Sequence, residues 1–241
     1  MGEEIRVDFN TGSGGGSGAG GSSGGTGAPQ PRVSSGTAGG DFDYRNLGPS
    51  FVQTAREVLF NPVGFFTGIR REGDFLNPLI FAVICSLISA VIGGVLGFVI
   101  SLATGNGIGG SLGGLISTII FTPIGTAIGL FIGGAIYHLL VLLLVRPSHQ
   151  GYEATFRVVA YASVVQLFSW LAVIPILGIL IAIAIAIYSV VLSVLGIREM
   201  HSTTTGRAVA VVLIPVILIT ILLVLIFGAV LFAIFAASQS Q

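Results

Sequence analysis

The sequence predicts an all-α, polytopic integral membrane protein with five transmembrane helices. Hydrophobic residues make up 53% of the 241 residues, whereas charged residues make up only 8%. A soluble globular domain carries about 25% charged residues, so this composition excludes an ordinary soluble enzyme. The apolar residues are also gathered into runs that reach the roughly 20 residues needed to cross a bilayer. A single cysteine, Cys85, excludes a disulfide framework within the chain.

The first 48 residues are predicted to form a disordered cytoplasmic tail. Nineteen of the thirty residues in 11–40 are Gly or Ser, and no hydrophobic residue recurs there with a regular period. Such a segment buries too little apolar surface to offset the entropy cost of ordering it. No apolar core follows Met1 closely, so the segment lacks the pattern of a signal peptide.

Residues 49–75 are predicted to form short amphipathic helices on the membrane surface before the first span. Apolar residues recur at helical spacing within 51–59. Asn61 suits the N-cap of a second helix, and Pro62 suits its first helical position. Apolar and aromatic residues continue over 63–69 and provide a face for the bilayer interface. The alternative is a juxtamembrane loop with chance aromatic residues.

Five apolar stretches follow, and each has the length of a transmembrane helix. The second is longer than a span needs, and we expect Pro123 to kink it and to leave 112–122 tilted or interfacial. A break at Pro175 divides the next long stretch into two short spans joined by a tight turn. The predicted spans, which together form a domain over 76–237, are 76–103, 112–145, 154–174, 176–197 and 208–237.

The arginines set the predicted orientation. All ten basic residues are Arg, and they either precede the first span or flank the loops between spans two and three and between spans four and five. The positive-inside rule places such segments in the cytoplasm. We therefore expect a cytoplasmic N-terminus and an external C-terminus. The Gly-rich tail and the absence of Lys indicate a high-GC prokaryotic genome, and hence the plasma membrane of a bacterium.

A glycine-rich segment matches a cofactor-binding pattern without its context. Residues 105–110 fit G-x-G-x-x-G, but dinucleotide binding needs a preceding strand, a following helix and an acidic residue about 20 residues on. Here the segment joins two spans, which predicts a turn. No nucleophile with a partner base and no cysteine cluster is present. We therefore expect a non-enzymatic protein with no cofactor, no metal and no nucleic-acid partner.

Glycines spaced four residues apart are predicted to pack the spans against one another. Gly93 and Gly97 lie on the first span, and Gly125, Gly129 and Gly133 lie on the second. Small residues at this spacing let helix backbones approach closely within a bilayer. We expect these contacts within one chain, and a homo-oligomer is the alternative.

The interiors of the predicted spans contain no Asp, Glu, Lys or Arg. Ion-coupled carriers use such groups as relays or ion sites, so the sequence disfavours that class. A permease or pore for small neutral solutes is the alternative function. Its lining would come from uncharged polar residues, which otherwise bond across helices: Thr118, Thr122, Thr126, Gln166, Ser169 and Ser193.

A histidine lies inside the second span. His138 lies seven residues before the end of that span, and Tyr161 lies seven residues into the next. In an antiparallel pair the two positions share a depth of roughly 10 Å, at about 1.5 Å per residue. We predict a structural hydrogen bond between them. An intramembrane enzyme built on His138 lacks a second catalytic group and ranks last among the functions considered.

The cytoplasmic loops contain the remaining polar groups. Glu153 and Arg157 lie four residues apart at a helix start, in the order that favours an ion pair. His149, Glu199 and His201 complete a conceivable metal site with Glu153. Solvated charge next to a membrane is the commoner use of such residues. We therefore interpret the loops as a docking face for a partner.

Several motifs in these segments resemble the Ypt-interacting-protein (Yip) domain family. They extend over about residues 55–225, and their order and spacing carry the resemblance. The matching motifs are FNPVGFF at 60–66, LNPL at 76–79, HLL at 138–140, YEATFRVVAYAS at 152–163, GIREMH at 196–201 and GRA at 206–208. The sequence departs from the family pattern at Val164 and Val165, where we expect a proline.

The resemblance implies five spans and a cytoplasmic N-terminus, in agreement with the count reached from the apolar stretches. Eukaryotic members act in vesicle traffic and contact small Rab-type GTPases, but a bacterium has no Golgi, so a Rab partner is not expected here. We interpret the chain as a non-enzymatic membrane organiser or adaptor that contacts the lipid bilayer and an unidentified cytoplasmic or membrane protein. The predicted docking residues are Asn61, Pro62, Phe65, Phe66, Glu153, Arg157, Glu199 and His201.

Overall fold

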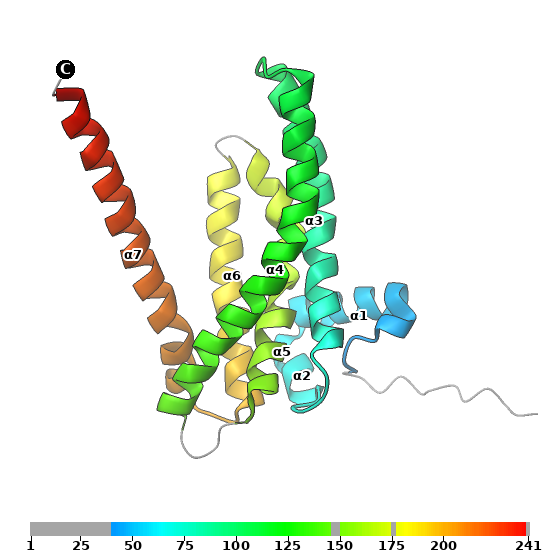
Figure 1. Ribbon diagram of the computed structural model, residues 1–241. Helices are drawn as coiled ribbons and strands as arrows, with labels where there is room; N and C mark the ends of the chain where they lie inside the picture. The colour runs from blue at the N-terminus through cyan, green and yellow to red at the C-terminus, as the bar shows by residue number, and fades with distance from the viewer. Residues whose placement is uncertain (1–39, 146–149, 175–176, 240–241) are drawn as a thin grey trace, which may run out of the picture. The chain divides into compact units, whose positions relative to one another are not determined.

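The described part of the chain folds into helices joined by short loops. A computed structural model describes residues 40–145, 150–174 and 177–239, and Figure 1 shows their arrangement. Five helices are long and apolar enough to cross a membrane, so the predicted fold class is confirmed. The elements are η1 (Tyr44–Asn46), α1 (Leu47–Phe60), α2 (Pro62–Gly68), α3 (Leu76–Ala103), α4 (Ile108–Leu144), α5 (Tyr152–Ala162), η2 (Ser163–Val173), α6 (Leu177–Met200) and α7 (Thr205–Gln239).

The folded part begins before the predicted boundary at residue 48. Most of the predicted tail, residues 1–39, lies outside the described residues. Residues 41–48 are part of the fold, because Phe42 is fully buried and its ring centroid lies 5.7 Å from that of Phe81 on α3. The Asp43 side chain accepts a hydrogen bond from a backbone N–H of η1 and caps it. The Phe42 ring and the Tyr44 backbone N–H, which donates to Asn77 Oδ1 at 3.3 Å, tie this segment to the first long helix.

α1 and α2 correspond to the two short helices predicted before the first span. Asn61 separates them, and its side chain accepts a hydrogen bond from the first turn of α2. Pro62 occupies the first helical position, so the predicted cap is confirmed. Phe65 and Phe66 of α2 are buried. α2 therefore packs into the protein with its aromatic face.

α3 and α4 form a long antiparallel hairpin (Figure 1). A turn joins them at Gly105, whose φ of +88° suits glycine. The interpretation of 105–110 as a turn is confirmed for 105–107, whereas 108–110 begin α4. Pro123 lies inside α4 without ending it. Residues 112–122 continue the helix beside α3, where a Cβ on Gly94 would lie 3.0 Å from a Leu115 methyl carbon. They remain part of α4, so the helix continues through Pro123.

The third span changes helix type along its length. α5 ends at Ala162, and η2 continues the span as a 3-10 helix from Ser163 to Val173. At the junction, the Ser163 hydroxyl donates to the Ala160 carbonyl at 2.5 Å. A 3-10 helix rises about 2.0 Å per residue, against about 1.5 Å for an α-helix. Apolar content alone does not distinguish the two, so the sequence pattern predicts a single helix.

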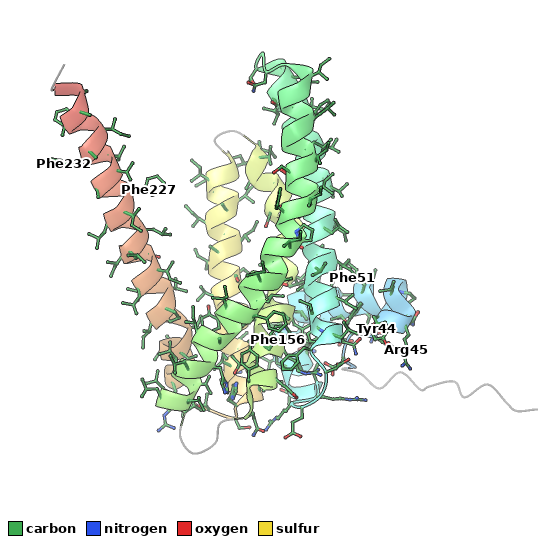
Figure 2. The ribbon with its side chains drawn as sticks, viewed as in Figure 1. Tyr44, Arg45, Phe51, Phe156, Phe227 and Phe232 are labelled. Atoms are coloured by element: carbon green, nitrogen blue, oxygen red, sulfur yellow. The ribbon has the colours of Figure 1, made fainter. Side chains whose placement is uncertain are left out.

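The long helices change surroundings along their length. From Leu87 onward α3 exposes most of its large apolar side chains, α7 does so from Ile214 onward, and α6 does so up to Val191. The opposite ends of these helices contain most of the buried core. We call this buried section the base; it comprises residues 41–86, 137–145, 150–165 and 188–213. Figure 2 shows Phe156 of the base among neighbouring helices, whereas Phe232 projects from the exposed part of α7.

Candidate functional site

Arg157 is the charged centre of the base. Its side chain is only 2% exposed, and Nη1 lies 2.6 Å from a carboxylate oxygen of Asp41. Nη2 donates to the Asp74 backbone carbonyl at 3.1 Å and lies 3.7 Å from the carboxylate of the same residue. The Tyr161 hydroxyl donates to the second Asp41 oxygen at 3.3 Å. One guanidinium thus joins α5 to the segment before η1 and to the turn before α3.

The predicted ion pair between Glu153 and Arg157 is wrong. Glu153 instead accepts a hydrogen bond from the Gly73 backbone N–H at 2.7 Å. Gly73 has a φ of +141°, and a Cβ there would lie 2.7 Å from Arg157 Nη2, so the position requires glycine. Exposed helical pairs contribute only about 0.2–0.5 kcal/mol. Glu153 and Arg157 therefore bond to groups from other segments, Gly73 and Asp41, and not to each other.

Two histidines in the base share one threonine hydroxyl. His138 Nδ1 and His201 Nε2 each lie 3.0 Å from Thr155 Oγ1. The Gln150 backbone N–H donates to His201 Nδ1 at 3.1 Å, which assigns the proton of the neutral ring to Nε2. Thr155 then accepts from His201 and donates to His138. The result is a chain of hydrogen bonds that joins α4, α5 and the end of α6.

The predicted hydrogen bond between His138 and Tyr161 is therefore replaced by other contacts. The Tyr161 hydroxyl is directed to Asp41, and its ring packs edge-on against Phe65 with a centroid distance of 5.0 Å. His138 meets Thr155 instead, nearer the start of α5. Sequence spacing predicts an approximate depth, but it does not predict the helix face on which each side chain lies.

The predicted docking residues divide between the interior and the surface of the base. Phe65, Phe66, Arg157 and His201 are buried, so they build the base and are not on its surface. The other four are partly or fully exposed: Asn61, Pro62, Glu153 and Glu199. Residue type alone therefore identified residues of the base, but it did not predict which of them are buried and which are exposed.

Glu199 lies in a cluster of exposed polar groups. Its backbone carbonyl accepts a hydrogen bond from Arg71 at 3.3 Å, and its carboxylate pairs with Arg198 at 2.6 Å. Arg71 also lines a hollow of about 400 Å³ that includes Glu153. We call the surface formed by residues 67–75, 150–153 and 198–199 the loop face.

The alternative metal site drew on His149, Glu153, Glu199 and His201. His149 lies outside the described residues. The other three bond to separate groups, and Glu153 and Glu199 contact different segments of the loop face. Over the residues that the structure describes, no group of three His, Cys, Asp or Glu side chains is arranged to hold a metal ion.

The predicted glycine contacts occur only in part. A Cβ on Gly93 would lie 3.4 Å from Trp170, and one on Gly133 would reach Val159 only at 4.0 Å. Space is open around the Cβ position at three of the predicted glycines: Gly97, Gly125 and Gly129. Close packing between α6 and α5 occurs instead at Gly196, where a Cβ would lie 2.5 Å from a methyl carbon of Val158.

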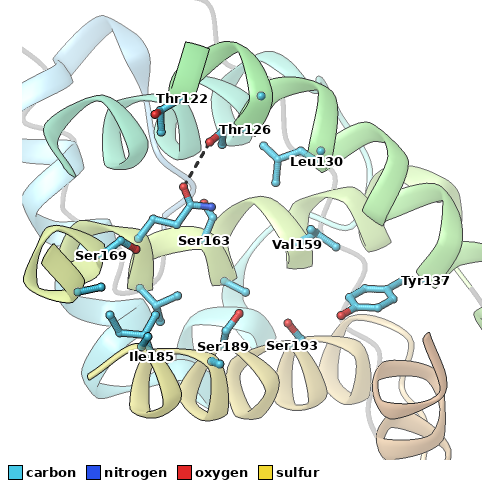
Figure 3. A pocket seen from close by; sticks show the side chains of 18 of the residues that line it. Thr122, Thr126, Leu130, Tyr137, Val159, Ser163, Ser169, Ile185, Ser189 and Ser193 are labelled. Atoms are coloured by element: carbon cyan, nitrogen blue, oxygen red, sulfur yellow. Dashed lines mark hydrogen bonds between the residues drawn. The ribbon is translucent and has the colours of Figure 1, made fainter. Parts of the chain in front are cut away.

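A cavity of about 760 Å³ lies between α4, η2 and α6 (Figure 3). The Thr126 hydroxyl donates to the Gln166 side-chain oxygen at 3.4 Å on its wall. Thr118 lines a separate pocket between α3 and α4. Five of the six polar residues predicted to line a pore face this one cavity: Thr122, Thr126, Gln166, Ser169 and Ser193.

Sequence reasoning missed three residues of the base. Asp41 stands at the end of the low-complexity tail, Asp74 lies in the turn before α3, and Thr155 has no unusual spacing. A signal for the two acids was available, because Arg157 lies in the first turn of an apolar span, and an arginine that becomes buried there needs a counter-charge. The signal for Thr155 was absent, since its role depends on two histidines that are distant in the sequence.

The comparison with protein families agrees with this architecture. The Yip1 domain matches residues 56–227, which extend from α1 into the exposed part of α7 and include most of the base and the cavity. No curated protein and no solved structure matches the chain. Because the match covers well over half of a helical chain with five candidate spans, the protein belongs to the Yip1 domain family and is a multi-pass membrane protein.

Proposed function

We propose that the protein is a non-enzymatic membrane organiser or adaptor that holds a partner protein at the loop face. The observation that carries this proposal is the collection of exposed charged groups at one end of a base with a buried core. Exposed loops on a rigid scaffold are suited to recognition. The five apolar helices would hold that scaffold in the bilayer.

The chemistry of the loop face favours a protein partner over a nucleic acid. Arg71, Glu72 and Glu153 line the same hollow, so charges of both signs lie close together. Nucleic-acid binding relies on a surface that is positively charged throughout. Phe75 and Tyr152 add aromatic surface to the hollow, as is common at the centre of protein interfaces.

The proposal places the loop face in the cytoplasm, with the N-terminus inside and the C-terminus outside the plasma membrane of a bacterium. Contacts support one common end for the arginine-bearing segments, because Arg157 meets Asp74 and Arg71 meets Glu199. The positive-inside rule then sets the side. A contact between copies of the chain would use the open glycine surface near Gly97.

Crosslinking affinity capture from native membranes tests the docking face. Charge reversal of three exposed residues, Arg70→Glu, Glu72→Arg and Glu199→Arg, changes the loop face without touching the buried Arg157. We expect a defined protein to be captured by the wild type and lost with this variant. Unchanged thermal unfolding in detergent would show that the variant is folded.

The matched control reverses charges on the outward surface of α1, with Arg56→Glu and Glu57→Arg. We expect this control to retain the partner, because α1 lies outside the loop face. Equal loss from both variants would indicate general electrostatic attachment and contradict the assignment of the docking face. Capture of the same protein by all three samples would contradict it as well.

A second candidate function is a small-solute permease, which the cavity between α4, η2 and α6 favours. Gln166 supplies the amide on the described cavity wall and bonds to Thr126. Solute flux into liposomes that is abolished by Gln166→Leu would support this function. Absence of flux for a series of neutral solutes would leave the adaptor proposal as the better account.

A further inference from the structure

The wall of the cavity offers hydrogen bonds that the described protein does not use. Figure 3 shows the hydroxyl groups of Ser189, Ser193 and Tyr137 directed into the space between α4, η2 and α6. Within the described residues, no hydrogen bond joins any of these three hydroxyls to another protein group, and none of the three oxygens is sealed inside the protein, so all three are reached from the cavity. Ser193 is only 5% exposed, whereas Ser189 and Tyr137 are half-buried. Buried polar groups in native proteins are nearly always partnered. The cavity is therefore prepared for a ligand that accepts and donates hydrogen bonds.

The described wall of the cavity carries no formal charge. Its polar groups are hydroxyls and one amide, and its other lining residues are apolar or glycine. A phosphate or carboxylate placed there would lack a cation to pair with, and an unpaired charge in such surroundings is strongly unfavourable. The wall therefore selects an uncharged ligand.

The cavity opens toward the lipid-exposed surface of the bundle. Phe121, Thr122 and Ala186 on its rim are exposed, and they lie on the parts of α4 and α6 that face away from the buried core. α7 does not close it, because every described residue of α7 from Ile217 to Ser238 is exposed. A ligand dissolved in the bilayer would thus enter from the side.

The size of the cavity indicates more than a small solute. Its volume of about 760 Å³ falls within the roughly 300–1,000 Å³ range of sites for drug-sized ligands. From these observations we propose that the cavity between α4, η2 and α6 binds an uncharged glycerolipid of the diacylglycerol class. Its free hydroxyl and ester carbonyls would meet Ser189, Ser193 and Tyr137. Its acyl chains would leave between α4 and α6 into the bilayer.

Two glycines allow a direct test of occupancy. Gly125 and Gly129 line the cavity, and no atom lies within 4 Å of a Cβ placed at either position. Leucines at both positions would place side chains in the cavity from Cβ positions that contact no protein atom. Gly113 is the matched control on the same helix, because its Cβ position is also open and it does not line the cavity.

The experiment uses the full chain in phosphatidylcholine nanodiscs with a photoreactive, clickable diacylglycerol as the probe. We expect the wild type and Gly113→Leu to be labelled on peptides of α4, η2 and α6, and dioctanoylglycerol to compete. Gly125→Leu with Gly129→Leu should abolish this competition while retaining wild-type thermal unfolding. Ser193→Ala should weaken competition roughly fivefold, as one lost hydrogen bond predicts.

Four results would overturn the proposal. The first is equal, competable labelling of the cavity-filled variant and the Gly113→Leu control. The second is labelling confined to the outer surfaces of α3 and α7. The third is equal competition by a short-chain phosphatidic acid, which would show no selection against charge. The fourth is equal competition by free glycerol, which would assign the cavity to a solute and favour the permease. None of these results depends on the loop face, so the adaptor proposal stands or falls separately.

Discussion

The Arg157 guanidinium is surrounded by the interior of the base, so its charge and its N–H donors need partners within the protein. Asp41 supplies the close ion pair, and Asp74 supplies a carbonyl and a more distant carboxylate. A buried ion pair need not add net stability, but removing one member leaves the other uncompensated. Loss of Arg157 should therefore weaken the contacts among α5, the segment before η1 and the turn before α3.

Replacing Arg157 with Met should lower the free energy of unfolding by about 3–5 kcal/mol, because it leaves Asp41 charged in the base without its partner. Thermal or denaturant unfolding in detergent measures the change. Arg56→Met on the exposed surface of α1 is the control and should stay within about 0.5 kcal/mol. Adding Asp41→Asn to Arg157→Met should recover part of the loss; no recovery would show that the pair is not the cause.

Thr155→Val should lower the free energy of unfolding by about 1–3 kcal/mol, because a buried nitrogen of His201 and a partly buried nitrogen of His138 lose their shared partner. The side chains are similar in size, so little packing is lost. Thr220→Val is the control, because that exposed hydroxyl bonds only to its own helix at the Val216 carbonyl, at 2.7 Å. Equal melting curves for Thr155→Val and the wild type would contradict a structural role for the shared hydroxyl.

At the scale of elements, the sequence predicts helices well and helix contacts poorly. The span 76–103 agrees with α3, and the other spans agree to within a few residues, because apolar length is a local property. Glycine spacing marks places where close approach is allowed, yet only tertiary structure decides where it occurs. Gly196 packs tightly in place of Gly125, and no local pattern distinguishes the two.

Gly196→Ala should lower the free energy of unfolding by about 1–3 kcal/mol through overpacking against Val158 and Phe66. Gly125→Ala should instead raise it slightly, because its Cβ position is open and Ala is favoured over Gly in a helix by about 1 kcal/mol. Unfolding of the two variants in the same detergent compares the signs. If Gly125→Ala destabilised the protein and Gly196→Ala did not, the result would support the glycine contacts predicted from the sequence.

For the whole molecule, the fold class, the family and the number of spans could be predicted, because each follows from composition and the order of motifs. The base could not, because its links join positions far apart in the chain. Asp41 and Arg157 are one example, and the Tyr188 hydroxyl, which donates to the Leu59 carbonyl, is another. The polar lining of the cavity could be predicted in part. Residue type identified five of its members, but only the structure shows that they surround one cavity.

The predicted orientation makes the ends of the chain behave differently in a living cell. A green fluorescent reporter fused after residue 241 should stay dark in a bacterial host, and alkaline phosphatase at the same place should be active. The reason is that an odd number of spans separates the C-terminus from an arginine-rich cytoplasmic side. The same reporters fused before Met1 should give the opposite result. A fluorescent C-terminal fusion would contradict the orientation.

Each of the helices α3, α6 and α7 has two environments along its length. One part is buried in the base, and the other exposes apolar side chains to its surroundings. A scan of all substitutions should find positions near the base sensitive to side-chain volume, because close-packed interiors resist a change of even one methylene. Beyond Leu87, Ile214 and Val191, apolar residues of different size should exchange freely, while charged ones should fail. The step between the two patterns of tolerance should fall at one depth on all three helices. It would mark the level at which each helix leaves the packed interior of the base and exposes its apolar side chains.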